Sequence, residues 1–97
     1  MLKSSKFLTL AQKSEIDMKI YDFMGSKNIC GSRVKEARKK CGLSQEALAA
    51  KLQVEGVNIE RDSVSRIEIG TRFVADYELL ALCKILNISP EYLLGMN

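Results

Sequence analysis

Two stretches of the sequence decide the fold: SQEALAAKLQ at residues 44–53 and RDSVSRIEIG at residues 61–70. The first begins with Ser44, a residue type that caps helix N-termini, and then places apolar residues three and four positions apart. The second has the same helical spacing and stops at Gly70, a residue typical of helix C-termini. The two stretches therefore predict consecutive helices, joined by residues 54–60.

The flanking sequence also has helical spacing. Residues 32–41 begin at a capping residue, Ser32, and repeat apolar or small side chains three and four positions apart. Residues 76–87 place four apolar side chains at positions i, i+3, i+4 and i+7. Ser89 precedes a proline, which is typical of a helix start, and opens a last short helix through Leu94. Since 97 residues make one domain, the prediction is a five-helix, all-α domain.

The composition excludes several classes of protein. The chain has no histidine, which removes the commonest general base and the commonest metal ligand. Its cysteines, Cys30, Cys41 and Cys83, are odd in number and lack the CxxC spacing of zinc ribbons, so we expect reduced thiols. No apolar run is long enough for a signal-peptide core or a membrane span. We expect a cytoplasmic protein that is not an enzyme, with no catalytic residue and no metal site.

The N-terminal part of the chain differs from the rest in charge. Residues 1–41 hold ten Lys/Arg and four Asp/Glu, whereas residues 42–97 hold five and eight, an asymmetry that indicates a polyanionic partner. We interpret residues 1–30 as an N-terminal extension. Residues 15–24 are compatible with one further helix, which would serve self-association. Its apolar stripe consists of Ile16, Ile20, Phe23 and Met24.

Two motifs in the predicted helices resemble those of a known family. LSQEALA at residues 43–49 and SRIE-G at residues 65–70 are similar to the helix-turn-helix domain of the lambda-repressor-like, Xre-type transcriptional regulators. The resemblance covers about residues 31–95 and implies a five-helix DNA-binding domain over residues 31–97. It implies a sequence-specific regulator, with repression as the expected mode, that binds double-stranded DNA. We expect a symmetric homodimer without a cofactor or small-molecule ligand.

The helix predicted at residues 61–69 carries the side chains that base reading requires. A major groove about 12 Å wide admits one helix, whose outward residues must be long or forked hydrogen-bonding groups. Arg61 and Arg66 can each offer two donors to guanine, while Asp62 can accept from cytosine. Ser63 can contact a base or a phosphate, and the resemblance implies that these four positions face bases. Asp62 has a second interpretation, since an acid in the first turn stabilises a helix without DNA.

Four residues are candidates for contacts with the DNA backbone. Ser44 and Gln45 lie at the start of their helix, where backbone N–H groups favour an anion. The resemblance implies a phosphate contact from Gln45, and the alternative is an ordinary exposed glutamine. Arg33 and Arg72 are candidates for neutralising phosphates by charge.

Arg38 has a different predicted role. The resemblance pairs it with Glu68 in a structural salt bridge that braces the two helices.

The sequence also departs from the family pattern, because the connector at residues 53–60 is several residues longer than the usual turn, a variation that the family includes. In addition, Ile69 stands where a polar residue is common, and Ala75 stands where a capping Ser or Thr is usual.

The sequence leaves two alternatives open. A protein-interaction module or antitoxin-like adaptor on the same fold is the alternative function, with residues 1–30 binding a partner. The small net charge of +3 favours it mildly. The homodimer surface is either the N-terminal stripe or the last helix, which carries Tyr92, Leu94 and Met96.

Overall fold

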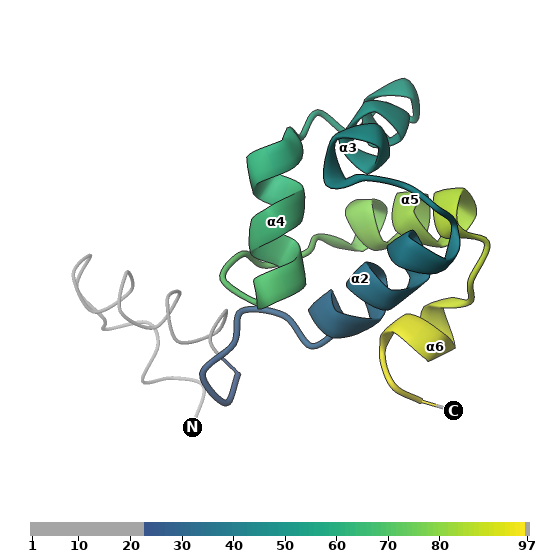
Figure 1. Cartoon of the computed structure of the whole chain (residues 1–97). Coiled ribbons are helices and arrows are strands. Elements are labelled where there is room, and N and C mark those ends of the chain that lie inside the picture. Colours follow the sequence, from purple (N-terminus) through teal and green to yellow (C-terminus); the bar gives the residue numbers. More distant parts are fainter. Residues whose placement is uncertain (1–22, 97) are drawn as a thin grey trace, which may run out of the picture.

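Five helices follow one another through residues 23–96, the part of the chain that the computed structural model describes (Figure 1). Their bounds are α2 Gly31–Lys40, α3 Gln45–Val54, α4 Arg61–Ile69, α5 Asp76–Leu86 and α6 Pro90–Leu93. The only bridge between extended residues in this part of the chain joins Phe23 and Ser26. The all-α prediction with five helices is confirmed, and within residues 23–96 no helix is long and apolar enough to span a membrane.

The helices enclose one apolar core. α4 packs against α2 and α3, α5 packs against α3 and α2, and the short α6 covers α2 and α5. The largest fully buried side chains come from all five helices: Val34, Leu48, Leu52, Val64, Ile67, Leu82 and Leu93. Burial of this apolar surface supplies most of the driving force for folding. Because α4 has neighbours on two sides, its orientation is fixed by the core.

The caps of three helices follow the predictions. The Ser44 hydroxyl accepts a hydrogen bond from the Ala47 backbone N–H at 3.0 Å, and the Ser89 hydroxyl accepts one from Tyr92 at 3.0 Å. Gly70 ends α4 in the left-handed region, with φ of 84°, where a residue without a Cβ is favoured. Local sequence signals therefore set these helix ends.

The predicted start of the first helix was wrong. α2 begins at Gly31, and its N-cap is Cys30 rather than Ser32. The backbone N–H groups of Cys30 and Gly31 donate to the side chain of Asn28, which lies upstream and takes the place of a capping serine. A Cβ added at Gly31 would overlap the carbonyl oxygen of Ile67, so α2 starts where its backbone touches α4.

The long connector between α3 and α4 is part of the core. Val57 and Ile59 are buried, with 6% and 5% of their surface exposed. The Val57 N–H donates to the carbonyl of Leu52 at 2.9 Å, and the Gln53 amide donates to the carbonyl of Ile59 at 2.8 Å. The extra residues are therefore anchored to the end of α3 and hold α4 in place.

The segment before α2 is folded onto the domain. Cys30 is 2% exposed and belongs to the core, so the folded unit begins before Gly31. Of the helix predicted at residues 15–24, residues 15–22 lie outside the described residues. Phe23 and Met24 are not helical: Phe23 exchanges backbone hydrogen bonds with Ser26 in a turn.

Two of the three thiols are buried. Cys30 and Cys83 lie in the core, and burial raises the pKa of both, so both stay protonated at neutral pH. Cys41 is exposed at the end of α2. The two buried thiols, Cys30 and Cys83, pack as small apolar groups.

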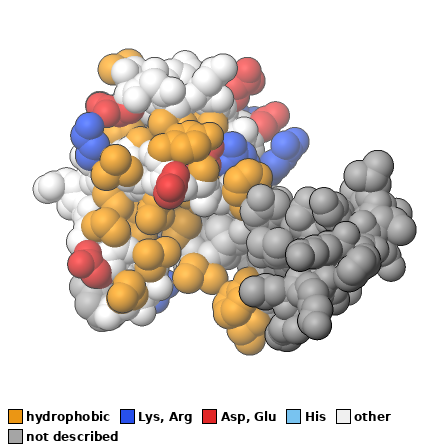
Figure 2. All heavy atoms as spheres, turned by 180° about the vertical axis from the view of Figure 1, so that it is seen from behind, with side chains coloured by type: hydrophobic (Ala, Val, Ile, Leu, Met, Phe, Trp, Pro, Cys, Tyr) orange, Lys and Arg blue, Asp and Glu red, His pale blue; other side chains and the backbone are white. Residues whose placement is uncertain are grey.

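Exposed hydrophobic side chains gather on the face seen from behind (Figure 2). A groove of about 400 Å³ lies between the segment before α2, the start of α5 and the C-terminal residues. Its apolar lining includes Ile29, Phe73, Val74, Leu79 and Leu94.

Candidate nucleic-acid interface

The helix α4 has two distinct faces. Val64, Ile67 and Glu68 point inward and are at most 7% exposed. Asp62 and Arg66, four residues apart, are exposed on the opposite face. This division follows from the sequence RDSVSRIEI, in which Val64 and Ile67 recur at helical spacing and most of the other positions are polar.

The four predicted base-reading residues come together along α4. Arg61, Asp62 and Arg66 are exposed, and Ser63 is half-buried. An ion pair joins Arg61 Nη2 to Asp62 Oδ1 at 3.2 Å, with 58% and 72% of the two side chains exposed. Such an exposed pair is screened by water and contributes about 0–1 kcal/mol, so both groups can exchange partners at low cost.

Arg66 presents a guanidinium that has no partner among the described residues. Among residues 23–96, no ion pair or hydrogen bond engages its side chain. The guanidinium has five N–H donors in a planar fork, which matches the two acceptors on the edge of guanine. Arg66 is therefore the side chain on α4 best prepared for a bidentate contact.

One outward residue was missed by the sequence interpretation. Ile69 is 68% exposed and follows Asp62 and Arg66 at helical spacing on the same face. The spacing of residues 62, 66 and 69, at positions i, i+4 and i+7, predicts from the sequence that they share one face of the helix. Ile69 gives the outward face of α4 an apolar end.

Arg38 and Glu68 form the predicted salt bridge. Arg38 Nε lies 2.6 Å from Glu68 Oε2, and Arg38 Nη2 lies 3.1 Å from Glu68 Oε1. The side chains are only 9% and 1% exposed. Arg38 Nη1 also donates to the carbonyl of Leu43 at 2.8 Å, so the guanidinium ties α2 to α4 and to the residues before α3.

Gln45 belongs to the same network. Its side-chain Nε2 donates to Glu68 Oε1 at 3.0 Å, which fixes the first turn of α3 against α4. The residue is half-buried rather than an ordinary exposed glutamine. Next to it Ser44 is exposed, and its hydroxyl oxygen already accepts the capping hydrogen bond, so the hydroxyl hydrogen is the part that can bind an anion.

Arg72 is engaged within the protein. Its Nη1 and Nη2 lie 2.9 Å and 3.0 Å from the two carboxylate oxygens of Glu78, and Nη1 donates to the carbonyl of Phe73. The bond to Glu78 raises the pKa of Arg72. Burial alone would raise the pKa of Glu78, but the bonds from Arg72 and from the Ala75 N–H together lower it. The Glu78 carboxylate thus satisfies the Ala75 N–H, while Ala75 itself supplies no side-chain cap to α5.

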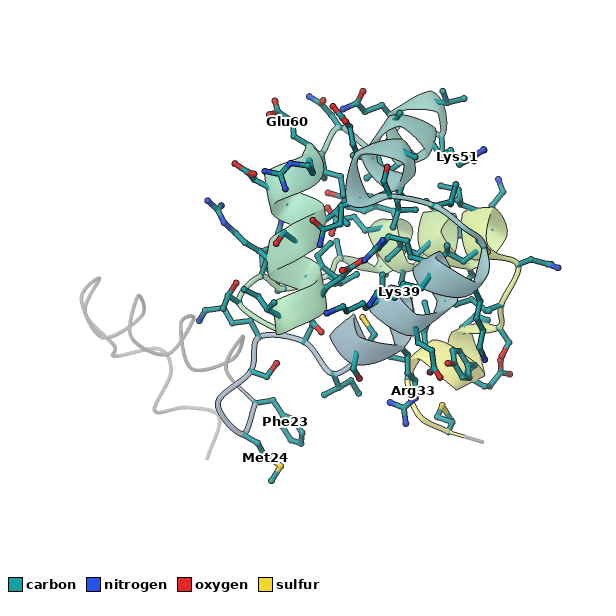
Figure 3. The ribbon with its side chains drawn as sticks, in the orientation of Figure 1. Phe23, Met24, Arg33, Lys39, Lys51 and Glu60 are labelled. Carbon is teal, nitrogen blue, oxygen red and sulfur yellow. The ribbon has the colours of Figure 1, made fainter. Side chains whose placement is uncertain are left out.

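Arg33 lies apart from the other candidates. Its guanidinium is close to Gly95 in the C-terminal segment, and Figure 3 shows it near α6 and away from α4. Nearby, the Tyr92 hydroxyl donates to Glu36 at 2.8 Å, a bond that raises the pKa of Tyr92. The structure therefore brings together the candidates on α3 and α4, while Arg33 belongs to the α6 side.

The sequence of the folded part of the chain matches a known family model. The model described as helix-turn-helix matches residues 34–93, which is more than half of the chain. The chain belongs to the helix-turn-helix family. The prediction of a lambda-repressor-like, Xre-type helix-turn-helix domain is confirmed.

Individual helix-turn-helix proteins share this similarity. The HTH-type transcriptional regulator ImmR of Bacillus subtilis (strain 168) is 40% identical over 67 residues, which are 69% of this chain and 49% of ImmR. The chain thus spans about half the length of this curated relative.

Residues 23–96 contain no cluster of three or more metal-binding side chains.

Two solved structures have the same fold. The P22 c2 repressor, crystallised with the synthetic operator 9T, has a TM-score of 0.62 and 30% identity, covering 71% of this chain and 97% of its own. The restriction-modification controller protein C.AhdI of Aeromonas hydrophila has a TM-score of 0.57 and 36% identity, covering 65% and 88%. These similarities confirm the lambda-repressor-like fold of the described residues.

Proposed function

We propose that this chain is a sequence-specific, double-stranded DNA-binding module of a transcriptional regulator, with repression as its mode, and that α4 reads the major groove. The observation that carries the proposal is the outward face of α4. Arg66 and Asp62 are exposed there on a helix whose other face is locked into the core. Two relatives support it: one is named a transcriptional regulator, and the other is a repressor solved with an operator.

The chemistry of base reading follows from these side chains. Arg66 donates two hydrogen bonds to guanine O6 and N7, and Asp62 accepts one from cytosine N4. Arg61 leaves its exposed pair with Asp62 to contact a base, which costs little because water already screens that pair. Ser63 offers its hydroxyl at the edge of the groove.

The start of α3 supplies the contact with the DNA backbone in this proposal. The Ser44 hydroxyl and the N–H groups of the first turn of α3 bind a phosphate, with Gln45 held beside them by Glu68. Arg72 adds charge from the loop after α4: its Nε–H and one Nη2–H lack acceptors among residues 23–96. Arg33 neutralises phosphate only where DNA reaches the α6 side.

We also propose that the module acts as a homodimer in the cytoplasm, without a catalytic role, a cofactor or a small-molecule ligand. A single module of this size buries limited surface on DNA, and two copies related by a twofold axis double the contacts. Leu94 and Met96 are exposed beside α6 and are available for such an interface. Sedimentation of the whole chain measures its oligomeric state.

The experiment that tests the function is selection of bound sites from random DNA duplexes, followed by affinity measurements over a range of salt concentrations. A DNA reader enriches one half-site, repeated at about one helical turn for a dimer. Its binding constant falls with salt at a log–log slope of about −0.9 per phosphate contacted. A protein-interaction module or adaptor enriches no sequence, and that result would reject the proposal.

A further inference from the structure

Asn28 lies where two helices meet. Its side-chain Oδ1 accepts hydrogen bonds from the N–H groups of Cys30 at 3.1 Å and Gly31 at 2.8 Å, so it caps the start of α2. Its side-chain Nδ2 donates to the carbonyls of Ile67 at 3.0 Å and Arg72 at 2.7 Å, at the end of α4 and just beyond it. All the hydrogen-bonding directions of one amide are thus used to join the N-terminus of α2 to the C-terminus of α4.

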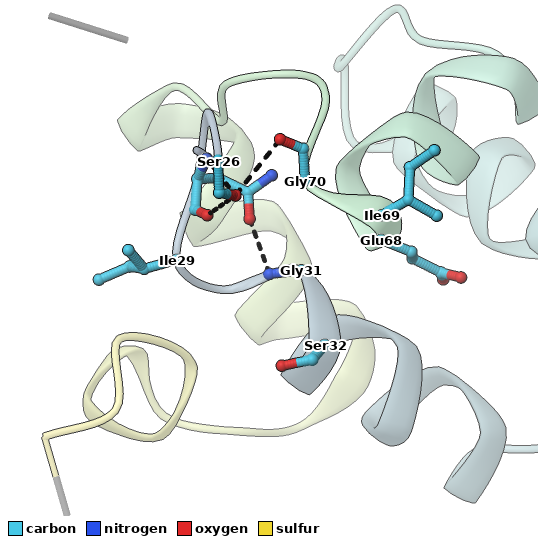
Figure 4. A pocket seen from close by; sticks show the side chains of 8 residues that line it. Ser26, Ile29, Gly31, Ser32, Glu68, Ile69 and Gly70 are labelled. Carbon is cyan, nitrogen blue, oxygen red and sulfur yellow. Dashed lines mark hydrogen bonds between the residues drawn. The ribbon is translucent and has the colours of Figure 1, made fainter. Parts of the chain in front are cut away.

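The residues around Asn28 strengthen this joint. The Ser26 hydroxyl donates to the carbonyl of Asn28 and lies 3.3 Å from the carbonyl of Gly70 (Figure 4). The Lys27 N–H donates to the same carbonyl of Gly70 at 2.8 Å. The carbonyls at the end of a helix have no partners within the helix, so these bonds from residues 26–28 satisfy groups that α4 leaves open.

The joint is tight enough to determine where α4 lies. There is no room for a side chain at Gly31, because its position touches the carbonyl of Ile67. Gly31 therefore allows the two helix ends to approach, and Asn28 fixes the distance at which they stop. Val64 and Ile67 are buried and hold the inner face of α4 against the core. Asn28 holds the C-terminal end of α4, just after Arg66.

We infer that Asn28 is a positioning residue for DNA recognition: it fixes the C-terminal end of α4 against α2 and thereby sets the angle at which Arg66 and Asp62 meet the bases. The inference rests on the proposed function of α4. Side chains that read a ligand must be held within about 0.5 Å and 10–20° of their productive geometry by the residues that support them. Nonspecific attraction to phosphates tolerates much larger displacements, because it depends on charge alone.

The test compares Asn28→Asp with the wild-type chain. The aspartate keeps the acceptor for the N–H groups of Cys30 and Gly31, but it loses the two donors and turns a carboxylate towards two carbonyl oxygens. Affinities are measured for the selected duplex and for a random duplex, at a temperature where circular dichroism shows each protein folded. Cys83→Ala is the matched control, since it removes a buried side chain of α5, which packs on α3, α2 and α6.

We expect Asn28→Asp to reduce the ratio of specific to random affinity by about tenfold, the size of one good base contact. Binding to random DNA and its salt slope should stay at the wild-type values, and Cys83→Ala should keep the wild-type ratio while lowering the thermal midpoint. An unchanged ratio in Asn28→Asp would overturn the inference and leave the proposed function intact. A wild-type chain that prefers no duplex would instead reject the proposed function, and the inference with it.

A milder variant covers the case in which Asn28→Asp does not fold. Ser26→Ala removes the hydroxyl that contacts Asn28 and Gly70 but leaves the Asn28 amide in place. The ratio of specific to random affinity should then fall by about threefold, a fraction of one base contact. A wild-type ratio in folded Ser26→Ala would overturn the inference.

Discussion

The inner and outer faces of α4 hold their charged side chains in opposite ways. On the inner face, Glu68 is 1% exposed in its side chain and bonds to Arg38 and Gln45. On the outer face, Asp62 pairs only with Arg61 across exposed side chains, and Arg66 has no ion pair among the described residues. The difference teaches that the nine residues of α4 separate a face that is held in the core from the face that we propose reads DNA. Substitutions on the two faces should therefore change different measurements.

The largest effect is expected on the inner face. Glu68→Ala leaves the buried guanidinium of Arg38 without its carboxylate and removes the acceptor of Gln45. We expect a loss of about 3–5 kcal/mol in the free energy of unfolding, measured by urea denaturation. As the control, the double variant Arg38→Met with Glu68→Leu should lose much less, because no buried charge is left unpaired. A single variant that loses under about 1 kcal/mol would mean that the pair behaves like a surface pair.

On the outer face, Arg66→Ala should act on DNA binding rather than on stability. We expect a loss of about 1–3 kcal/mol on the selected duplex and relaxed discrimination at one base pair, measured by fluorescence anisotropy. Its free energy of unfolding should change by at most about 0.5 kcal/mol, as for other surface residues. Lys84→Ala removes one positive charge from the exposed side of α5 and is the matched control. Equal losses on selected and random DNA would exclude Arg66 from base reading.

The pair between Arg72 and Glu78 is intermediate between the two faces, with 24% and 5% of its side chains exposed. Because the pKa of Glu78 is lowered in the folded state, its contribution to stability is present above its ordinary pKa. That contribution is lost as the pH falls through the folded pKa. Glu78→Gln should cost about 1 kcal/mol at neutral pH, and its thermal midpoint should depend less on pH in the acid range. A parallel pH profile in wild type and Glu78→Gln would show that the pair does not contribute.

The smallest effect is expected from Ile69. Its exposed side chain can contact the methyl group of a thymine, the one apolar group in the major groove. Ile69→Ala should weaken binding by less than about 1 kcal/mol, roughly the value of one buried methylene. Replacing thymines of the selected half-site by deoxyuridine should have a similar effect on the wild type and little on Ile69→Ala. Additive losses from the two changes would mean that Ile69 and the methyl group are not in contact.

The helix-turn-helix pair was predictable because its signals are local. Ser44 and Gly70 act within one turn of the helices that they delimit, and the predicted bounds of α4 agree with the structure. The inward and outward faces of α4 also follow from periodicity alone. Ile69 was not among the predicted contact residues because those were chosen as hydrogen-bonding side chains, although its position in the helical repeat indicated the outward face.

The features that the sequence did not predict depend on contacts between distant residues. Asn28 caps α2 and also bonds to residues about forty positions away, so nothing next to Ser32 indicated that the cap lay upstream. Likewise, the direction of Arg33 towards the C-terminal segment depends on how α6 folds back on α2. The position of the Glu78 side chain had a local signal, since Glu78 stands three residues after the N-cap Ala75, where a carboxylate reaches back to the N-cap N–H. This position brings the Glu78 carboxylate to Arg72.

The buried connector between α3 and α4 has a consequence for cooperativity. Val57 and Ile59 lie in the same core as the helices on either side. A connector of this kind is not a hinge, because α4 cannot swing away from α3 without exposing both side chains to water. We therefore expect one sigmoidal transition in chemical denaturation, with helix content and the environment of Tyr92, which packs against the core, changing together. The outward face of α4 then forms or melts as a unit with the rest of the domain.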